Sequence, residues 1–263
     1  MMRITAMAYM WQSHAFWWVA GIVGGLFACY LGLVFFAALL EKQHIRLLRP
    51  VDGRTLPVGA ELVAEAERHR FRNLGTFSDG DKGFREGIAT FMLASDGVEL
   101  LWIVRSKLAR RHQISTRLAD GTWLVTSSVK GTNDLSGLRR EEMLPGAALG
   151  PMLHFHRSRL AAMGEAVAPF QAENVTEDWV AHARARVDAM VQRGVGRYRA
   201  CGLAGGDPAE NATVWSYTLR GALKLVACHL RDLSQTSRQM KQSQAAADDA
   251  IEQWRRQQGG GNG

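Results

Sequence analysis

Two histidines separated by one residue, His154 and His156, form the closest histidine pair in the chain. On a strand, alternate side chains share a face, and two imidazoles there could hold zinc or copper. On a helix the two side chains point about 200° apart, so one ion could not bind both from one face. Residues 152–160 favour a helix, and no third ligand is close in sequence. We therefore expect structural histidines, no metal site and no cofactor.

Two further motifs have simpler explanations. Residues 79–83 match the start of a calcium loop, but its fifth and twelfth positions, Gly83 and Thr90, lack the expected ligands. We interpret the segment as a solvent-exposed turn. Cys201 lies close in sequence to two arginines, which would lower the pKa of an exposed thiol. We interpret it as a bystander cysteine rather than a nucleophile.

The spacings that mark known catalytic classes are absent. The sequence has no Gly-x-Ser-x-Gly, His-Glu-x-x-His, Walker A or Cys-x-x-Cys motif. Gly194-Val195-Gly196 lacks the third glycine of a dinucleotide fingerprint and follows a predicted helix rather than a strand. We name no catalytic, cofactor-binding or metal residue and expect a non-enzymatic protein. The alternative is an enzyme whose site is assembled from residues scattered along the chain.

The excess of basic residues indicates which partners the protein could bind. The chain carries a net charge of +7, and the part after residue 40 carries 31 − 25 = +6. Near an anionic bilayer each Lys or Arg contributes about 1 kcal/mol of binding. The membrane-surface candidates are Lys42, Arg46, Arg49, Arg105, Lys107, Arg110 and Arg111. We do not expect nucleic acid as a partner, because the tryptophans lie on apolar strands instead of among the arginines. A solubilising surface is the plain alternative.

One apolar segment would hold these residues at a membrane. Residues 15–40 contain no Asp, Glu, Lys, Arg, Asn or Gln. Their 26 residues would form a helix about 39 Å long, which exceeds the roughly 30 Å of hydrocarbon. A cleaved signal peptide is the alternative, but its apolar region is only about 7–15 residues long and follows several basic residues. The sequence therefore predicts a single transmembrane helix.

Flanking charges predict the orientation of that helix. Arg3 precedes it, whereas Lys42, Arg46, Arg49 and Arg54 follow it. The positive-inside bias places the C-terminal side in the cytoplasm and the N-terminus outside. The use of only three cysteines agrees with a reducing compartment. We expect a single-pass protein of a bacterial inner membrane.

Small residues form a ridge along the predicted span. Gly21, Gly24, Gly25, Ala28 and Gly32 recur at a spacing of about four residues. Such a ridge lets two helix backbones approach closely and predicts a homodimer through the transmembrane helix. Ordinary glycine enrichment in membrane helices is the alternative.

The next pattern is that of strands. Residues 88–94 and 98–104 flank Ser95-Asp96-Gly97, and residues 112–118 and 122–128 flank Ala119-Asp120-Gly121. Asp-Gly between two apolar runs is a strong hairpin signal. Two successive hairpins predict a four-stranded antiparallel meander.

The faces of these strands differ. Residues 100–104 are apolar on both faces, so their strand is expected at the centre of the sheet. Gln113, Ser115 and Arg117 alternate with apolar or β-branched residues, which predicts one solvent-exposed face for their strand.

Helices are predicted around this meander, at 61–70, at 143–163 and after Asn174, with a loop at 73–83. A long C-terminal helix is expected from about residue 211 or 213, with a stripe from Trp215 to Leu233. The fold class is therefore α+β. The expected organisation is a short segment at 1–14, the transmembrane helix at 15–40, a juxtamembrane segment at 41–83, the α+β domain at 84–233, and a polar helical or disordered tail at 234–263.

These patterns together predict a membrane-anchored binding, scaffold or regulatory module at the cytoplasmic membrane surface. Its expected partners are anionic lipid headgroups, a second copy of the chain and an unidentified protein. The alternative is a membrane-anchored enzyme.

Overall fold

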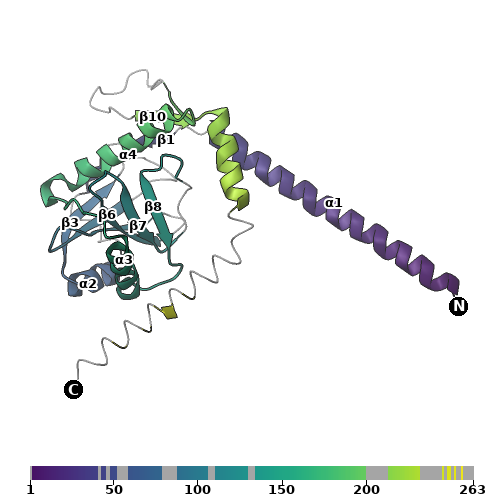
Figure 1. Ribbon diagram of the computed structural model, residues 1–263, viewed down its shortest axis with the longest axis horizontal. Helices are drawn as coiled ribbons and strands as arrows, with labels where there is room; N and C mark the ends of the chain where they lie inside the picture. Colours follow the sequence, from purple (N-terminus) through teal and green to yellow (C-terminus); the bar gives the residue numbers. More distant parts are fainter. Residues whose placement is uncertain are drawn as a thin grey trace.

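Figure 1 shows the computed structural model of the chain, with α1 (Met2–Leu40) projecting away from the rest of the protein. The structure describes residues 2–40, 43–45, 48–51, 59–78, 88–105, 110–129, 134–199 and 213–231, together with residues 245, 248–249, 252 and 256. Within α1, Trp17–Leu40 is long and apolar enough to cross a membrane. The predicted polar tail and the 79–83 loop fall mostly or wholly outside the described residues.

A seven-stranded mixed sheet forms the centre of the domain, in the order β2-β3-β4-β5-β6-β7-β8. Every neighbouring pair is antiparallel except β7 and β8, which are parallel. The strands are β2 (Arg49–Pro50), β3 (Phe71–Ser78), β4 (Ile88–Ala94), β5 (Leu100–Arg105), β6 (Arg110–Arg117), β7 (Trp123–Ser127) and β8 (Arg139–Met143). The α+β class is confirmed.

The predicted meander corresponds to β4–β7, and its two Asp-Gly turns are present. Gly97 and Gly121 have φ values of 73° and 83°, a conformation that favours glycine. β5 lies at the centre of the sheet, as its two apolar faces indicate. Four strands, however, is too few. β3 occupies part of the predicted 73–83 loop, because a register shift between Asn73 and Gly75 lets polar and glycine residues join a ladder.

Helices cover both faces of the sheet (Figure 1). α2 (Ala60–Arg68) and α3 (Leu149–Met163) pack on one face, and α4 (Val175–Gln192), preceded by η1 (Ala172–Asn174), packs on the other. α3 begins six residues later than the predicted residue 143, because β8 ends at Met143 and a turn at Gly146 (φ 70°) follows it. Pro151 lies in the first turn of α3, where its missing N–H costs no helical hydrogen bond.

α4 also overturns the predicted solvent-exposed face of β6. Gln113 and Ser115 are 1% and 0% exposed. They lie on the face that α4 covers, in register with Trp102 and Leu100 of β5. A polar stripe in this strand therefore reflects buried polar packing rather than contact with water.

A second, three-stranded sheet joins the domain to α1. Its order is β1-β10-β9, with β1 (Gln43–Ile45), β10 (Thr213–Tyr217) and β9 (Gly196–Tyr198) all antiparallel. The predicted start of the long C-terminal helix, at residue 211 or 213, is wrong. The β-branched and aromatic run of β10 forms a buried strand, and the described helix covers only residues 219–231.

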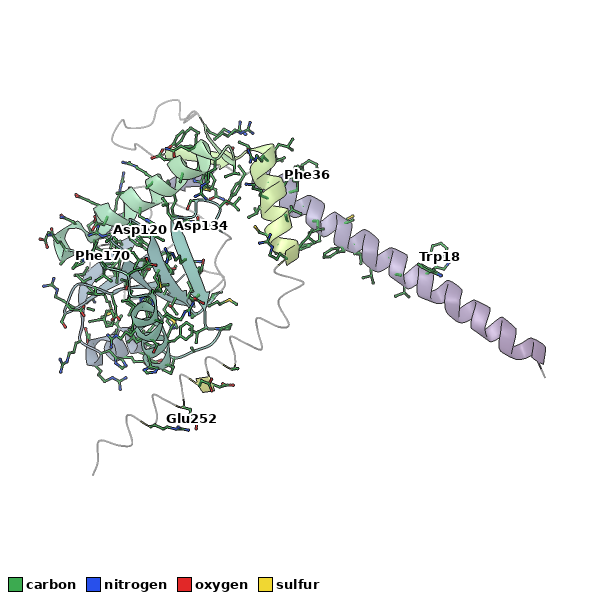
Figure 2. The ribbon with its side chains drawn as sticks, in the orientation of Figure 1. Trp18, Phe36, Asp120, Asp134, Phe170 and Glu252 are labelled. Carbon is green, nitrogen blue, oxygen red and sulfur yellow. The ribbon has the colours of Figure 1, made fainter. Side chains whose placement is uncertain are left out.

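The last turns of α1 are part of the domain core. Ala38 is 6% exposed and packs in one cluster with α4 and β10 residues and with Ala222 of the 219–231 helix. Tyr30 and His229 are joined by a side-chain hydrogen bond of 2.8 Å. Figure 2 shows Phe36 close to this junction, whereas Trp18 lies far out along α1. The domain is thus held directly on the helix.

Candidate ligand-binding site

Aromatic packing fixes α4 against the sheet. The Trp179 ring lies 5.5 Å from Phe91, 4.7 Å from Trp102 and 5.6 Å from Trp123, measured between ring centroids. Three aromatic rings on three strands therefore hold one side chain of α4. This contact positions the next turns of α4 over the polar part of β6, β7 and β8.

Polar side chains gather beside these rings, in what we name the arginine–tryptophan cluster. Its members are Trp102, Arg111, Gln113, Arg139, Glu141 and His182. Gln113 is the direct cross-strand neighbour of Trp102. Gln113 is buried and the other five members are half-buried, so the cluster is partly reachable from solvent.

Arg139 is at the centre of the cluster. Its Nη2 donates to Gln113 Oε1 at 3.2 Å and lies 3.4 Å from Glu141 Oε1. Burial lowers the pKa of Arg139, and the charge of Glu141 opposes that effect. Arg139 is therefore a desolvated cation with a single close carboxylate within the cluster.

Arg111 is the second cation of the cluster. Its guanidinium lies 4.9 Å from the centroid of the Trp102 ring, a cation–π contact. Burial lowers the pKa of Arg111, again opposed by the charge of Glu141. No hydrogen bond joins the Arg111 guanidinium to any residue that the structure describes. Arg111 and Arg139 thus share one carboxylate.

A neutralised ion pair borders the cluster. Arg186 of α4 donates from Nε and Nη2 to Asp134 Oδ1 at 3.2 and 3.0 Å. Burial alone would raise the pKa of Asp134, but the charge of Arg186 and hydrogen bonds from Ser136 bring it below its usual value. Asp134 also accepts from the backbone N–H of Arg139 at 3.2 Å and so fixes the start of β8 (Figure 2). The pair adds no net charge.

His182 closes the α4 side of the cluster. Its ring stacks on Trp123 at 4.2 Å with an interplanar angle of 12°. Burial, and then the charges of Arg186 and Arg139, lower the pKa of His182 to about 3. The imidazole is therefore neutral at physiological pH and can donate only one N–H.

Four members of the cluster have unused hydrogen-bonding atoms. Trp102 Nε1, Arg139 Nε, Glu141 Oε1 and His182 Nε2 are buried and have no hydrogen-bond partner among the described residues. Glu141 Oε1 is also the oxygen that pairs with Arg139 at 3.4 Å. Buried polar groups are usually paired, so several unpaired atoms in one cluster are notable. Chemically, the cluster offers two N–H donors, one carboxylate acceptor, an imidazole nitrogen and an excess of one positive charge.

A cavity of about 530 Å³ lies elsewhere, between the ends of β3 and β4 and the segment at 170–173. Arg70 and Arg72 line it, but so do Asp96 and Glu173, so its charges balance. This cavity has no comparable set of unpaired polar atoms among the described residues.

The structure places the predicted histidine pair on α3. His156 is fully buried and uses both ring nitrogens, with Thr116 Oγ1 at 2.9 Å and Thr126 Oγ1 at 2.8 Å. Neither nitrogen is left for a metal ion. Among the described residues, no group of three or more His, Cys, Asp or Glu side chains could hold one. Cys201, the predicted bystander, lies outside the described residues.

The predicted membrane-surface residues are not brought together in the described part of the chain. Arg49 is exposed on β2, and Arg111 belongs to the arginine–tryptophan cluster. The others lie outside the described residues or have undescribed side chains: Lys42, Arg46, Arg105, Lys107 and Arg110. Their role at a membrane stays a prediction.

The predicted helix-dimer ridge is open. A Cβ built on Gly21, Gly24, Gly25 or Gly32 would meet nothing within 4 Å, and Ala28 is exposed. The homodimer also stays a prediction.

Sequence reasoning found Arg111 but missed Arg139, Glu141 and His182 as members of a site. The only available signal was the charged pattern of residues 139–142, which resembles a solvent-exposed turn more than a strand. Comparisons with protein-family models, curated proteins and solved structures found no match to this chain.

Proposed function

We propose that this protein is a single-pass membrane-anchored binding module, whose α+β domain is held at the cytoplasmic surface of a bacterial inner membrane. The observation that carries the proposal is the direct packing of the domain onto the end of α1. Ala38 and its neighbours share a core with α4 and β10, so the end of the apolar helix packs directly against the domain. A domain attached in this way stays at a fixed height above the bilayer.

The 219–231 helix supports the same arrangement. Leu219 and Leu223 are 61% and 56% exposed, although the helix itself packs beside the exposed apolar surface of α1. Arg220 and Lys224 alternate with these leucines. A helix with exposed leucines and basic residues suits the headgroup region of an anionic bilayer. We therefore place this helix at the lipid interface.

The chemistry of the arginine–tryptophan cluster favours binding over catalysis. Its titratable members are Arg111, Arg139, Glu141 and His182, and none of them is an activated nucleophile. A low pKa keeps His182 neutral, which suits a hydrogen-bonding role. The alternative hypothesis, an anchored enzyme, needs a nucleophile or an acid–base pair beside this cluster.

Membrane extraction and orientation test the proposal on the full chain. We expect the protein to stay in the membrane pellet after alkaline carbonate washing, because α1 spans the bilayer. Leu26, 67% exposed on α1, provides the matched variant: Leu26→Arg places a charge in the span and should release protein to the wash. In right-side-out vesicles, added protease should leave the domain intact until detergent is added. Cleavage of the domain in sealed vesicles would contradict the cytoplasmic placement.

A further inference from the structure

We infer that the arginine–tryptophan cluster is a binding site for a soluble phosphate group, either hydrogen phosphate or a phosphate monoester, held between Arg111 and Arg139. This inference rests on the proposed binding role and gives it a ligand class. The site is formed by side chains of β5, β6 and β8 beneath α4.

The charges of the cluster favour an anion. Arg111 and Arg139 are both partly desolvated, yet among the described residues Glu141 is the only carboxylate that acts on both of them. The neighbouring Asp134 is already matched by Arg186. A desolvated cation without a full counter-charge is costly, so an anion beside Arg111 and Arg139 would lower the free energy of the folded protein.

The unused hydrogen-bonding atoms favour an oxyanion. Arg139 Nε and Trp102 Nε1 are N–H donors without a partner among the described residues, and neutral His182 can donate from Nε2. Guanidinium groups bind phosphate oxygens in a fixed fork geometry. The Arg111 guanidinium makes no hydrogen bond to a described residue, so within that part of the chain its donors can face such a ligand.

Glu141 selects among oxyanions. Its Oε1 is buried and lies 3.4 Å from Arg139 Nη2 in an ion pair, but it accepts no hydrogen bond from a described residue. An ionised carboxylate attracts an O–H group but repels a bare anionic oxygen. Hydrogen phosphate and protonated phosphate monoesters carry both kinds of oxygen, whereas sulfate at neutral pH carries no O–H. The geometry therefore favours phosphate over sulfate.

The position of the cluster favours a soluble ligand over a lipid headgroup. His182 precedes Met190 by eight residues on α4, which is about 12 Å along the helix axis. Met190 belongs to the core that contacts α1, whereas His182 faces the cluster. The cluster thus lies along α4 away from the contact with the membrane-spanning helix.

Titration of the full chain in neutral detergent micelles tests this site. Inorganic phosphate is added at constant ionic strength, and binding is followed by calorimetry and by tryptophan fluorescence, since Trp102 lies in the site. We expect saturable phosphate binding, with sulfate weaker by roughly tenfold because Glu141 rejects it. Vesicles of phosphatidic acid, added in place of phosphate, should not produce the same fluorescence change.

Matched variants separate the site from general surface charge. Arg111→Gln should abolish phosphate binding while the protein stays folded, because among the described residues this guanidinium makes a cation–π contact with Trp102 and no hydrogen bond. Arg140→Gln is the control: Arg140 follows Arg139 on β8, is exposed, and pairs with Glu165 on the opposite face of the sheet. Arg140→Gln should leave phosphate affinity unchanged. Glu141→Gln should remove the preference for phosphate over sulfate.

Three results would overturn the inference: no saturable phosphate signal, equal losses in Arg111→Gln and Arg140→Gln, or a response to phosphatidic acid alone. None of these outcomes depends on membrane extraction or orientation. A protein that binds phosphate but is released by carbonate would refute the anchoring proposal and leave this site intact. A protein that stays in the membrane pellet but does not bind phosphate would refute only the phosphate site.

Discussion

We predict that the free energy of unfolding falls in mild acid, because His156 is buried as a neutral side chain. Burial, and then the charge of Arg157, lower the pKa of His156 from 6.5 to about 4. Below pH 6.5 the unfolded chain therefore takes up a proton that the folded protein refuses. The stabilisation is fully present above pH 6.5 and is lost as the pH falls toward 4. This pKa difference corresponds to about 3 kcal/mol, or about 1.4 kcal/mol per pH unit within the window.

Urea unfolding of the full chain in detergent micelles, followed by tryptophan fluorescence between pH 4 and pH 8, measures this effect. In the His156→Gln variant, the slope of unfolding free energy against pH should fall by about one proton. His182 has a lowered pKa and the same sign, so the slope should decrease without vanishing. Thr126→Val is the matched control, because it removes a hydrogen bond to His156 but retains the titrating ring.

The expected control result is a lower free energy of unfolding at every pH, with the acid slope retained. Equal slopes in the wild type and His156→Gln would refute the reasoning, since another group would then take up the proton. A slope lost in Thr126→Val would also refute it, because the hydrogen bond rather than the proton would be responsible.

Three further predictions concern packing and assembly. Arg157 donates to both oxygens of the Glu99 carboxylate, which is 3% exposed. Arg157→Gln should therefore lower the free energy of unfolding, measured in urea, by about 3 kcal/mol. Adding Glu99→Gln should recover part of that loss. Gly221→Ala would place a methyl group against a neighbouring carbonyl oxygen, so we expect a lower thermal midpoint and faster proteolysis of the 219–231 helix. Gly24→Leu combined with Gly32→Leu should abolish self-association in a membrane reporter; unchanged association would count against the ridge.

Local chemistry explains which strands were predictable from sequence. The β4–β7 meander was predictable because Asp-Gly turns and apolar alternation act over a few residues, as Gly97 and Gly121 show. β8 was not, because its pairing with β7 is parallel and its sequence, from Arg139 to Met143, is mostly charged. β10 was not predicted because Trp215 fits a helical stripe as well as a strand. The strand is formed by pairing with β1, which is distant in sequence.

The candidate site was largely hidden for the same reason. Arg111 attracted attention as one of several basic residues, but sequence gave no indication that it stacks on Trp102. The alternating pattern of its strand predicts a solvent-exposed Gln113, whereas α4 buries this residue. His182 and Arg139 are far apart in the chain, and only the register of β8 and the packing of Trp179 bring them to one place. Patterns of spacing cannot reveal a site that depends on three separate tertiary contacts.

The interlocking of α1 with the domain has a consequence for proteolysis. A protease that cut the backbone just after Leu40 would remove the covalent link but not the apolar contacts of Ala38 with Val187, Met190 and Trp215. The cleaved domain would remain bound to the end of α1. Its release would expose the apolar residues of this contact to water, so a fragment that starts at residue 41 should aggregate instead of staying soluble.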